Sequence, residues 1–169
     1  VNGGGFLNAD HAVLTTGRAE LNGAGNLQNY RVEQGKVAIE GKGLDGKGAD
    51  SVSILARTIN VNAGVWANKL NTRTGQNHID ANNLKATALE SSTVETKPMI
   101  GLDVAAVGGM YANHITMVST EAGVGVNLNG VVAGTQSVSV DANGHLSVNG
   151  MLQSDTSLVA KANSIQNIK

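Results

Sequence analysis

The stretch GVGVNLNGVVAG, residues 123–134, places a glycine or an asparagine at almost every break between its valines, and it contains no charged or aromatic residue. Glycine costs roughly 1 kcal/mol relative to alanine inside a helix, whereas valine packs well on the pleated surface of a strand. Glycine and asparagine also tolerate the backbone angles of tight turns. The stretch therefore predicts short strands that are separated by sharp corners.

The same alternation of apolar and polar residues recurs along the chain. Segments with one apolar face, as expected of short strands, lie at residues 37–39, 51–54, 58–61, 137–140 and 145–148. Between such segments are breaks at which positive φ angles cost little, namely Asn22-Gly23, Asn62-Ala63-Gly64, Asn129-Gly130, Asn143-Gly144 and Asn149-Gly150. Residues 82–91 lack a convincing apolar stripe, so they are predicted to be a loop or a strand.

Two internal repeats indicate how these strands are arranged. Asn129-Gly130-Val131-Val132 recurs 20 residues later as Asn149-Gly150-Met151-Leu152, and Val138 and Leu158 keep the same offset. Residues 1–17 and 61–75 share a Val-Asn, a glycine corner, an aromatic residue and a closing Thr-Gly. Such repeats are typical of a solenoid. We predict an all-β fold of roughly eight parallel coils, with a rod length on the order of 40 Å.

A hairpin architecture is the competing interpretation. Asn-Gly between apolar strands is also the strongest local hairpin signal, and it would give an antiparallel sandwich or barrel. A hairpin sheet does not require a 20-residue offset, so the repeat favours the solenoid. In a solenoid, valine and leucine point into a narrow interior, and asparagines can form hydrogen-bonded ladders between coils.

Two stretches break the repeat and are predicted to leave the coils. Residues 26–40 read as a polar hairpin that turns at Glu33-Gln34-Gly35-Lys36, and residues 86–98 are rich in Thr and Ser and end at Pro98, the single proline. Exposed loops on a rigid scaffold often carry recognition, but they also serve to cover a sheet edge. The sequence favours neither role.

The composition limits the classes of function. Aromatic residues make up 2% of the 169 residues, so the core must consist of thin layers of Val, Ile, Leu and Ala. A net charge of −1 without a basic block argues against a nucleic-acid partner. The absence of Cys excludes disulfides and thiolate zinc sites. No apolar run approaches the roughly 18 residues of a membrane span, and Val1 follows no leader, which predicts a removed or truncated N-terminus.

Long strings of the sequence resemble the secretion domain of two-partner-secretion (TPS) exoproteins. These strings are residues 1–18, 43–77 and 101–130. The family includes filamentous haemagglutinin adhesins, large haemolysins and contact-dependent growth-inhibition proteins of Gram-negative bacteria. The resemblance runs from Val1 to about Asn129, and residues 130–169 resemble the haemagglutinin repeats that follow in such proteins.

The resemblance implies a right-handed parallel β-helix with extra-helical hairpins. It divides the chain into a secretion domain at 1–129, which lacks the family's N-terminal cap and Asn-Pro-Asn motifs, and continuous following coils at 130–169. It further implies a non-catalytic secretion and surface-adhesion module that nucleates β-helix folding. The expected partners are an outer-membrane barrel transporter with periplasmic recognition domains and a host or neighbouring-cell surface. The expected location is secreted or at the cell surface, without membrane insertion.

Catalytic, cofactor and metal sites are not predicted. His11, His78, His114 and His145 have no paired spacing and read as isolated surface histidines. Asp45 and Asp50 lie in GKGLDGKGAD, a single irregular copy of a pattern that binds Ca²⁺ only as several tandem nine-residue repeats. Gly-x-Ser-x-Gly, zinc-protease and phosphate-binding motifs are absent. The partner-binding residues are not predictable from the sequence.

A carbohydrate-binding or carbohydrate-cleaving β-helix protein is the alternative function. Asp80, Glu90 and Asp103 are the carboxylates that could serve as acids, although their spacing does not support it. Trp66 could stack on a sugar. An aromatic residue between Val65 and Ala67 at a repeated coil position is, however, expected in the core or in a coil cap.

Overall fold

The computed structural model describes residues 1–90 and 95–168, which contain strands and no α-helix. No helix long and apolar enough to cross a membrane occurs in these residues. The strands are β1 (Asn2–Gly5), β2 (Ala9–Thr15), β3 (Arg18–Leu21), β4 (Leu27–Val32), β5 (Lys36–Ala56), β6 (Thr58–Val61), β7 (Gly64–Thr74), β8 (Asn77–Asp80), β9 (Ala86–Ala88), β10 (Ile100–Val104), β11 (Gly109–Ser119), β12 (Gly125–Leu128), β13 (Val131–Val148), β14 (Met151–Ser154) and β15 (Ser157–Asn167).

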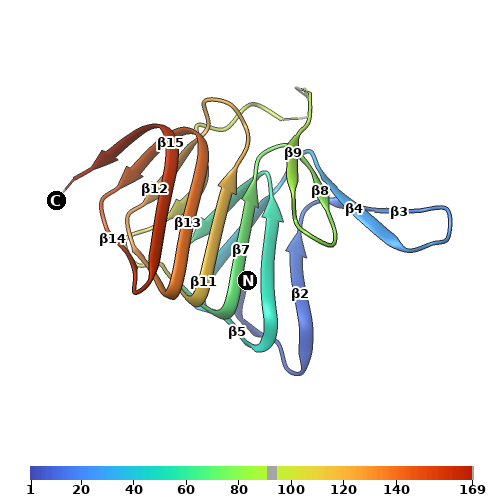
Figure 1. Ribbon diagram of the computed structural model, residues 1–169, viewed down its shortest axis with the longest axis horizontal. Coiled ribbons are helices and arrows are strands. Elements are labelled where there is room, and N and C mark those ends of the chain that lie inside the picture. The colour runs from blue at the N-terminus through green and yellow to red at the C-terminus, as the bar shows by residue number, and fades with distance from the viewer. Residues whose placement is uncertain (91–94, 169) are drawn as a thin grey trace.

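An 11-stranded sheet winds around one axis as a stack of coils (Figure 1). Every strand pair in this sheet is parallel, so the competing antiparallel sandwich is wrong. Within the described ranges the coils are fewer than predicted, because residues 17–35, 75–90 and 95–99 leave the stack. Successive coils begin at Asn2, Lys36, Thr58, Ile100 and Gly125, and another begins within β13, where Leu146 lies opposite Val126.

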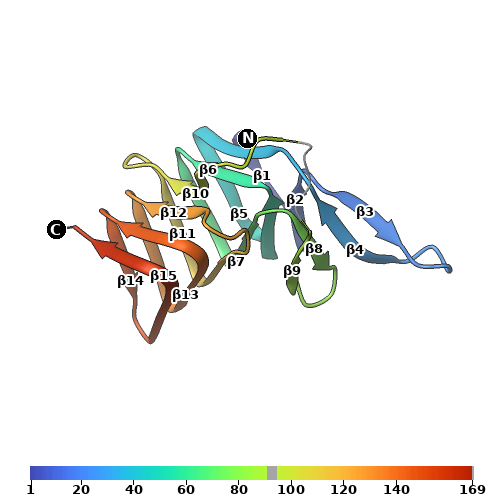
Figure 2. The same ribbon diagram turned by 90° about the horizontal axis from the view of Figure 1, so that it is seen from above.

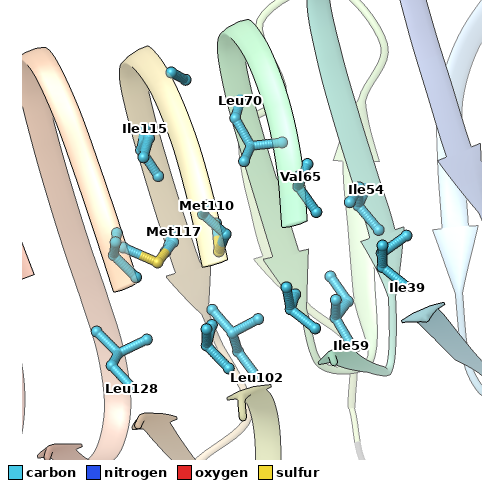
Figure 3. Close-up of a cluster of buried hydrophobic side chains, with 14 of the residues drawn as sticks. Ile39, Ile54, Ile59, Val65, Leu70, Leu102, Met110, Ile115, Met117 and Leu128 are labelled. Carbon is cyan, nitrogen blue, oxygen red and sulfur yellow. The ribbon is translucent and has the colours of Figure 1, made fainter. Parts of the chain in front are cut away.

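Columns of aliphatic side chains from successive coils fill the interior (Figure 3). One column consists of Ile59, Leu102, Val126 and Leu146, each paired in register with the next. These side chains are at most 1% exposed. Because one coil lies directly over another, each buried side chain contacts the chains above and below it, which confirms the predicted thin layered core.

The structure confirms both internal repeats. Val131, Val132 and Val138 pair in register with the residues 20 positions later, Met151, Leu152 and Leu158. Val61 and Thr74 occupy the positions of Val1 and Thr16 two coils earlier, as the pairing of both segments with β5 requires. The aromatic residues of the second repeat do not match, because Phe6 packs against the interior core whereas Trp66 lies on the outer face.

The predicted reason for glycine at one row of corners is wrong. Gly130 and Gly150 do not have positive φ. Instead, a Cβ added at Gly130 would lie 2.2 Å from the carbonyl oxygen of Gly108, and one added at Gly150 would lie 2.0 Å from that of Gly130. These three residues form a glycine column in which successive corners approach too closely for a side chain. Beside it, Asn149 donates to Asn129 Oδ1 at 2.7 Å, which is one rung of the predicted asparagine ladder.

A second, antiparallel sheet of β3, β4, β8 and β9 lies outside the coils (Figure 2). Its buried residues Val32 and Ile79 cover Leu55 of β5, forming a small separate core. The sheet is fastened by Arg73 of β7, which is 7% exposed and donates to the carbonyl oxygen of Leu84 at 3.0 Å. Burial lowers the pKa of Arg73 below its ordinary value.

The hairpin predicted at residues 26–40 is misplaced. The observed hairpin joins β3 to β4 and turns at residues 22–26, where Asn22 Oδ1 accepts hydrogen bonds from the backbone N–H groups of Ala24 and Asn26. Lys36 instead begins β5, which pairs with β6. This pairing places Ile39 in the core and packs Val37 against it. The Asn-Gly signal at 22–23 was the stronger turn.

The second predicted excursion does leave the coils. Within residues 82–91, predicted as a loop or a strand, a turn precedes the short strand β9. The chain then returns to the stack at β10, just after Pro98. Residues 91–94 of this excursion lie outside the described residues.

Candidate functional site

The last coil of the stack presents an uncovered apolar surface, here called the open end and defined by Leu158 and Ile165. These side chains are 45% and 53% exposed, whereas Val138 and Leu146, their in-register neighbours one coil earlier, are at most 1% exposed. A hollow of about 640 Å³ runs across this end. The open end therefore repeats the apolar pattern of an interior layer at a solvent-exposed surface.

The backbone of the open end is also unpaired on one side. Among the described strands, β15 pairs with β13 alone, so one row of its N–H and C=O groups faces outward. Such an edge is a template for another parallel strand. Apolar rows and free backbone groups together make this end able to receive a further coil in register.

At the row of corners that follows β5 and β11, a buried ion pair joins three segments of the chain. Arg57, at 2% exposure, donates from Nη2 to Glu121 Oε1 at 2.8 Å and from Nε to Glu121 Oε2 at 3.3 Å. Its Nη1 donates to the backbone carbonyl oxygen of Glu95 at 3.1 Å. We call these three residues the arginine clasp. The hydrogen bond to Glu121 raises the pKa of Arg57 above its ordinary value, against the opposing effect of burial.

The arginine clasp lines a cleft of about 540 Å³ together with Lys97 and Asn143. Glu95 extends the clasp, since both of its carboxylate oxygens accept from the backbone N–H of Gly35 at 3.3 Å. The clasp thus binds the second excursion to the coils at the corner where the first excursion rejoins them. Because the guanidinium already has carboxylate and carbonyl partners, its primary effect is to position these segments.

The three candidate acids lie in different elements. Asp80 ends β8 in the outer sheet, Asp103 lies in β10 of the coils, and Glu90 is an exposed residue after β9. Asp80 accepts hydrogen bonds from the backbone N–H groups of Asn83 and Asn82, which lower its pKa below the ordinary value. Asp103 has one carboxylate oxygen buried without a partner in the described structure. The fold does not assemble these carboxylates into one site.

The sequence suggested that the histidines are isolated. In the structure, three of the four bridge neighbouring coils. His11, His114 and His145 each place Nδ1 2.7 Å from a serine hydroxyl on the next coil, those of Ser51, Ser137 and Ser164 respectively. His78 lies 3.3 Å from Glu20 in the outer sheet. In the described part of the chain no three His, Asp or Glu side chains are grouped so that they could hold a metal ion, the stretch around Asp45 and Asp50 included.

Trp66 lies on the outer face of β7 and not in the core or a cap, which corrects the prediction. Its ring stacks on that of Tyr111, the in-register residue of β11. A signal for this pair was present in the sequence, since Gly64-Val65-Trp66 and Gly109-Met110-Tyr111 share a Gly-x-aromatic pattern.

Comparison with known proteins gives consistent matches. A family model described as the TPS secretion domain matches residues 1–148. Toxin CdiA of Yersinia pestis is 44% identical over 155 residues, covering 90% of this chain and 5% of that protein. The tRNA nuclease CdiA of Escherichia coli (strain NC101) is 44% identical over 151 residues, covering 89% of this chain and 4% of that protein. The chain therefore spans only a small part of these relatives.

A solved structure is similar throughout the chain. The crystal structure of the filamentous hemagglutinin secretion domain superposes with a TM-score of 0.81 at 26% sequence identity. The match covers 96% of this chain and 63% of that one. Both the parallel coils and the outer sheet lie within the matched length.

Proposed function

Because this chain belongs to the family of TPS secretion domains, we propose that it is a non-catalytic module that an outer-membrane barrel transporter recognises and that nucleates the folding of later coils. Exoproteins of this family are secreted or carried at the surface of Gram-negative bacteria. The proposed partner is the set of periplasmic domains of the transporter. Neither nucleic acid binding nor membrane insertion is part of the proposal.

The open end is the observation that supports nucleation. Full burial of a Leu or Ile side chain contributes roughly 1.5–3 kcal/mol, so a coil that covers Leu158 and Ile165 gains a contribution of this size from each. The first coil must form without an ordered neighbouring coil. Each later coil forms against a coil that is already ordered. Parallel coils have non-local contacts and fold slowly, so a preformed end accelerates the slowest step outside the cell.

The proposal includes finer points. We propose a right-handed sense of winding and a functional division into a secretion domain at 1–129 and following coils at 130–169 that share its stack. Surface adhesion to a host or a neighbouring cell is also part of the proposal, and the outer face of the coils is the surface that would make such contacts. A carbohydrate-cleaving role has no support, because Asp80, Glu90 and Asp103 lie in different elements.

Nucleation is tested by secretion of a full-length exoprotein that carries this domain, expressed together with its barrel transporter. Val126→Asp places a carboxylate in the interior column, where the native side chain is 1% exposed. Ser139→Asp adds the same group at an outward-facing position of β13 and is the matched control. We expect the first variant to lower the amount of surface protein severely and the second to leave it near wild type. Equal secretion of both variants would contradict nucleation.

Transporter recognition is tested separately with the purified chain and the purified periplasmic domains of the transporter. Saturable binding in isothermal titration calorimetry is expected. If no binding is detected while Val126→Asp still blocks secretion, recognition by this chain is wrong and nucleation stands. If the chain binds the periplasmic domains but its Val126→Asp variant is secreted normally, the results support recognition and contradict nucleation.

A further inference from the structure

The hairpin that joins β3 to β4 turns at an Asn-Gly pair, and this turn projects away from the coils (Figure 2). Asn22 and Gly23 are both exposed, and a Cβ added at Gly23 would have no neighbour within 4 Å. In such a pair the glycine nitrogen can reach the asparagine side-chain amide, because glycine has no side chain to obstruct the approach. The chain contains this pair at five places, namely Asn2-Gly3, Asn22-Gly23, Asn129-Gly130, Asn143-Gly144 and Asn149-Gly150.

Two backbone donors hold the side-chain oxygen of Asn22. Its Oδ1 accepts from the N–H of Ala24 at 2.9 Å and from the N–H of Asn26 at 3.0 Å. Two N–H groups at these distances from a carbonyl oxygen form the arrangement of an oxyanion hole, which stabilises the negative charge that develops when a nucleophile adds to the carbonyl carbon. The turn therefore favours addition at Asn22 Cγ.

The backbone nitrogen of Gly23 is the nucleophile beside this carbon. In the part of the chain that the structure describes, the Gly23 N–H has no hydrogen-bond acceptor, so water has access to its proton. Other bonds fix the turn without engaging this nitrogen. The Gly25 N–H donates to the Asn22 carbonyl oxygen at 3.0 Å, and the Asn22 N–H donates to the Asn26 carbonyl oxygen at 2.8 Å.

The glycine column protects two of the other Asn-Gly pairs. The Gly130 N–H donates to the carbonyl oxygen of Val104 at 3.1 Å, and the Gly150 N–H donates to that of Leu128 at 3.0 Å. A nitrogen held in this way attacks only after its bond to the preceding coil breaks, which requires local opening of the stack. These corners should therefore react slowly.

The remaining two pairs lack the paired donors. Asn2 Oδ1 accepts from one backbone N–H, that of Lys42 at 3.0 Å. Asn143 uses its amide nitrogen, which donates to the carbonyl oxygen of Thr120 at 3.0 Å. Among the Asn-Gly pairs in the described residues, Asn22 is thus the one asparagine whose side-chain oxygen has two backbone donors.

We propose that Asn22-Gly23 is a self-modifying site, at which the hairpin turn promotes deamidation of its own asparagine. The Gly23 nitrogen loses its proton to water and adds to Asn22 Cγ, and negative charge collects on Oδ1 between the two N–H donors. Nδ2 then takes a proton from water and leaves as ammonia, which closes a cyclic succinimide. Water opens this ring at either carbonyl, so the reaction consumes one water, releases one ammonia and gives aspartate or isoaspartate. This site is independent of the secretion role.

The two products change the hairpin tip differently. Aspartate keeps the side-chain length of asparagine and still accepts from the N–H groups of Ala24 and Asn26, so it adds a negative charge and preserves the turn. Isoaspartate lengthens the main chain within the turn and displaces these donors. The modification therefore alters the charge or the path of an exposed tip and leaves the coils unchanged.

The purified chain is incubated in a mildly alkaline buffer, once folded and once unfolded in urea, and peptide mapping by mass spectrometry follows each Asn-Gly pair. In the folded chain, Asn22 should deamidate at least about tenfold faster than Asn129 and Asn149, whose corners must first open. Unfolding should make the rates similar, and it should slow Asn22 because it removes both donors. Equal rates at the three sites in the folded chain, or a reaction of Asn22 that is no faster folded than unfolded, overturns the proposal.

Two variants separate the effect of the turn from that of the Asn-Gly pair itself. Ala24→Pro removes the N–H that lies 2.9 Å from Asn22 Oδ1, whereas Ala24→Gly retains it and is the matched control. Deamidation of Asn22 should slow at least about fivefold in the first variant and stay near the wild-type rate in the second. Circular dichroism checks that both variants fold, and the folded and unfolded wild-type chain decides the matter if Ala24→Pro does not. Equal rates in the two folded variants contradict a promoting role of the turn and overturn the proposal.

Discussion

Arg57 and Glu121 form a two-point contact between segments 64 residues apart, with Nη2–Oε1 at 2.8 Å and Nε–Oε2 at 3.3 Å. The guanidinium is almost fully buried, and the Glu121 side chain is 13% exposed. A buried ion pair of this kind contributes little net stability compared with apolar residues of similar shape, but an unpaired buried charge costs a great deal. The pair therefore specifies where the excursions attach to the coils.

Glu121→Ala should lower the free energy of unfolding by about 3 kcal/mol, because it leaves the buried Arg57 with weaker partners. Arg57→Met removes the charge and keeps most of the side-chain volume, so its effect should be distinctly smaller. Urea unfolding followed by circular dichroism measures both. An effect of Arg57→Met larger than that of Glu121→Ala would show that the clasp itself stabilises the fold.

Gly130→Ala should destabilise the chain by about 2 kcal/mol or more, since the added methyl group overlaps the Gly108 carbonyl and the corner must shift. Gly23→Ala is the matched control, because a Cβ there has no neighbour within 4 Å and Gly23 does not have positive φ. It should change stability by less than about 1 kcal/mol. Thermal unfolding compares the two, and equal melting temperatures would refute the close-packed glycine column.

Asp80 should titrate below its ordinary pKa of 3.8, because the backbone N–H groups of Asn83 and Asn82 stabilise the carboxylate. A carboxyl group with a lowered folded-state pKa binds its proton less readily in the folded chain. Its contribution to stability is therefore present above pH 3.8 and is lost as the pH falls through the lowered value. NMR titration of the Asp80 side chain tests the direction. Asp80→Ala should remove this part of the pH dependence.

The open end should make the isolated chain associate at high concentration, because it exposes apolar rows beside an unpaired strand edge. Replacing Leu158 and Ile165 together by lysine should suppress this association with little change in melting temperature, since both side chains are about half exposed. Val107→Lys alters a more exposed apolar residue, 81% accessible, at the corner between β10 and β11 and is the control. Light scattering against concentration measures the effect. Persistent association of the double variant would place the contact elsewhere.

The coiled architecture was predictable because neighbouring coils repeat the same residue types at a fixed distance along the sequence. The 20-residue offset between Val138 and Leu158 is the pairing of β13 with β15, and the Val-Asn and Thr-Gly echoes mark equivalent positions two coils apart. Where coils have similar lengths, residues one repeat apart in the sequence lie next to each other on adjacent coils. The parallel coils and the layered aliphatic core, which depended on this relationship, were predicted correctly, whereas the number of coils was not.

Features that depend on coils of unequal length were not predictable. The serines that meet His11, His114 and His145 lie 40, 23 and 19 residues along the chain, so no fixed spacing reveals them. Trp66 was assigned to the interior because its apolar neighbours suggested burial, but in a strand it is those neighbours, Val65 and Ala67, that point inward. The hairpin turn was misplaced because burial of Val37 and Ile39 in the core outweighs the local turn preference of residues 33–36.

The glycine column also determines where the chain can gain length. Its corners follow β10, β12 and the end of β13 after only a few residues, whereas both long departures leave from another corner, after β2 and β7. A residue inserted at the corner of Gly108, Gly130 or Gly150 would force two successive turns apart. A residue inserted after Thr16 or Thr74 would lie outside the stack of coils and would leave the coil spacing unchanged. In this chain, added length is therefore tolerated along one edge of the rod, whereas the close approach of the glycine corners sets the coil spacing along the other.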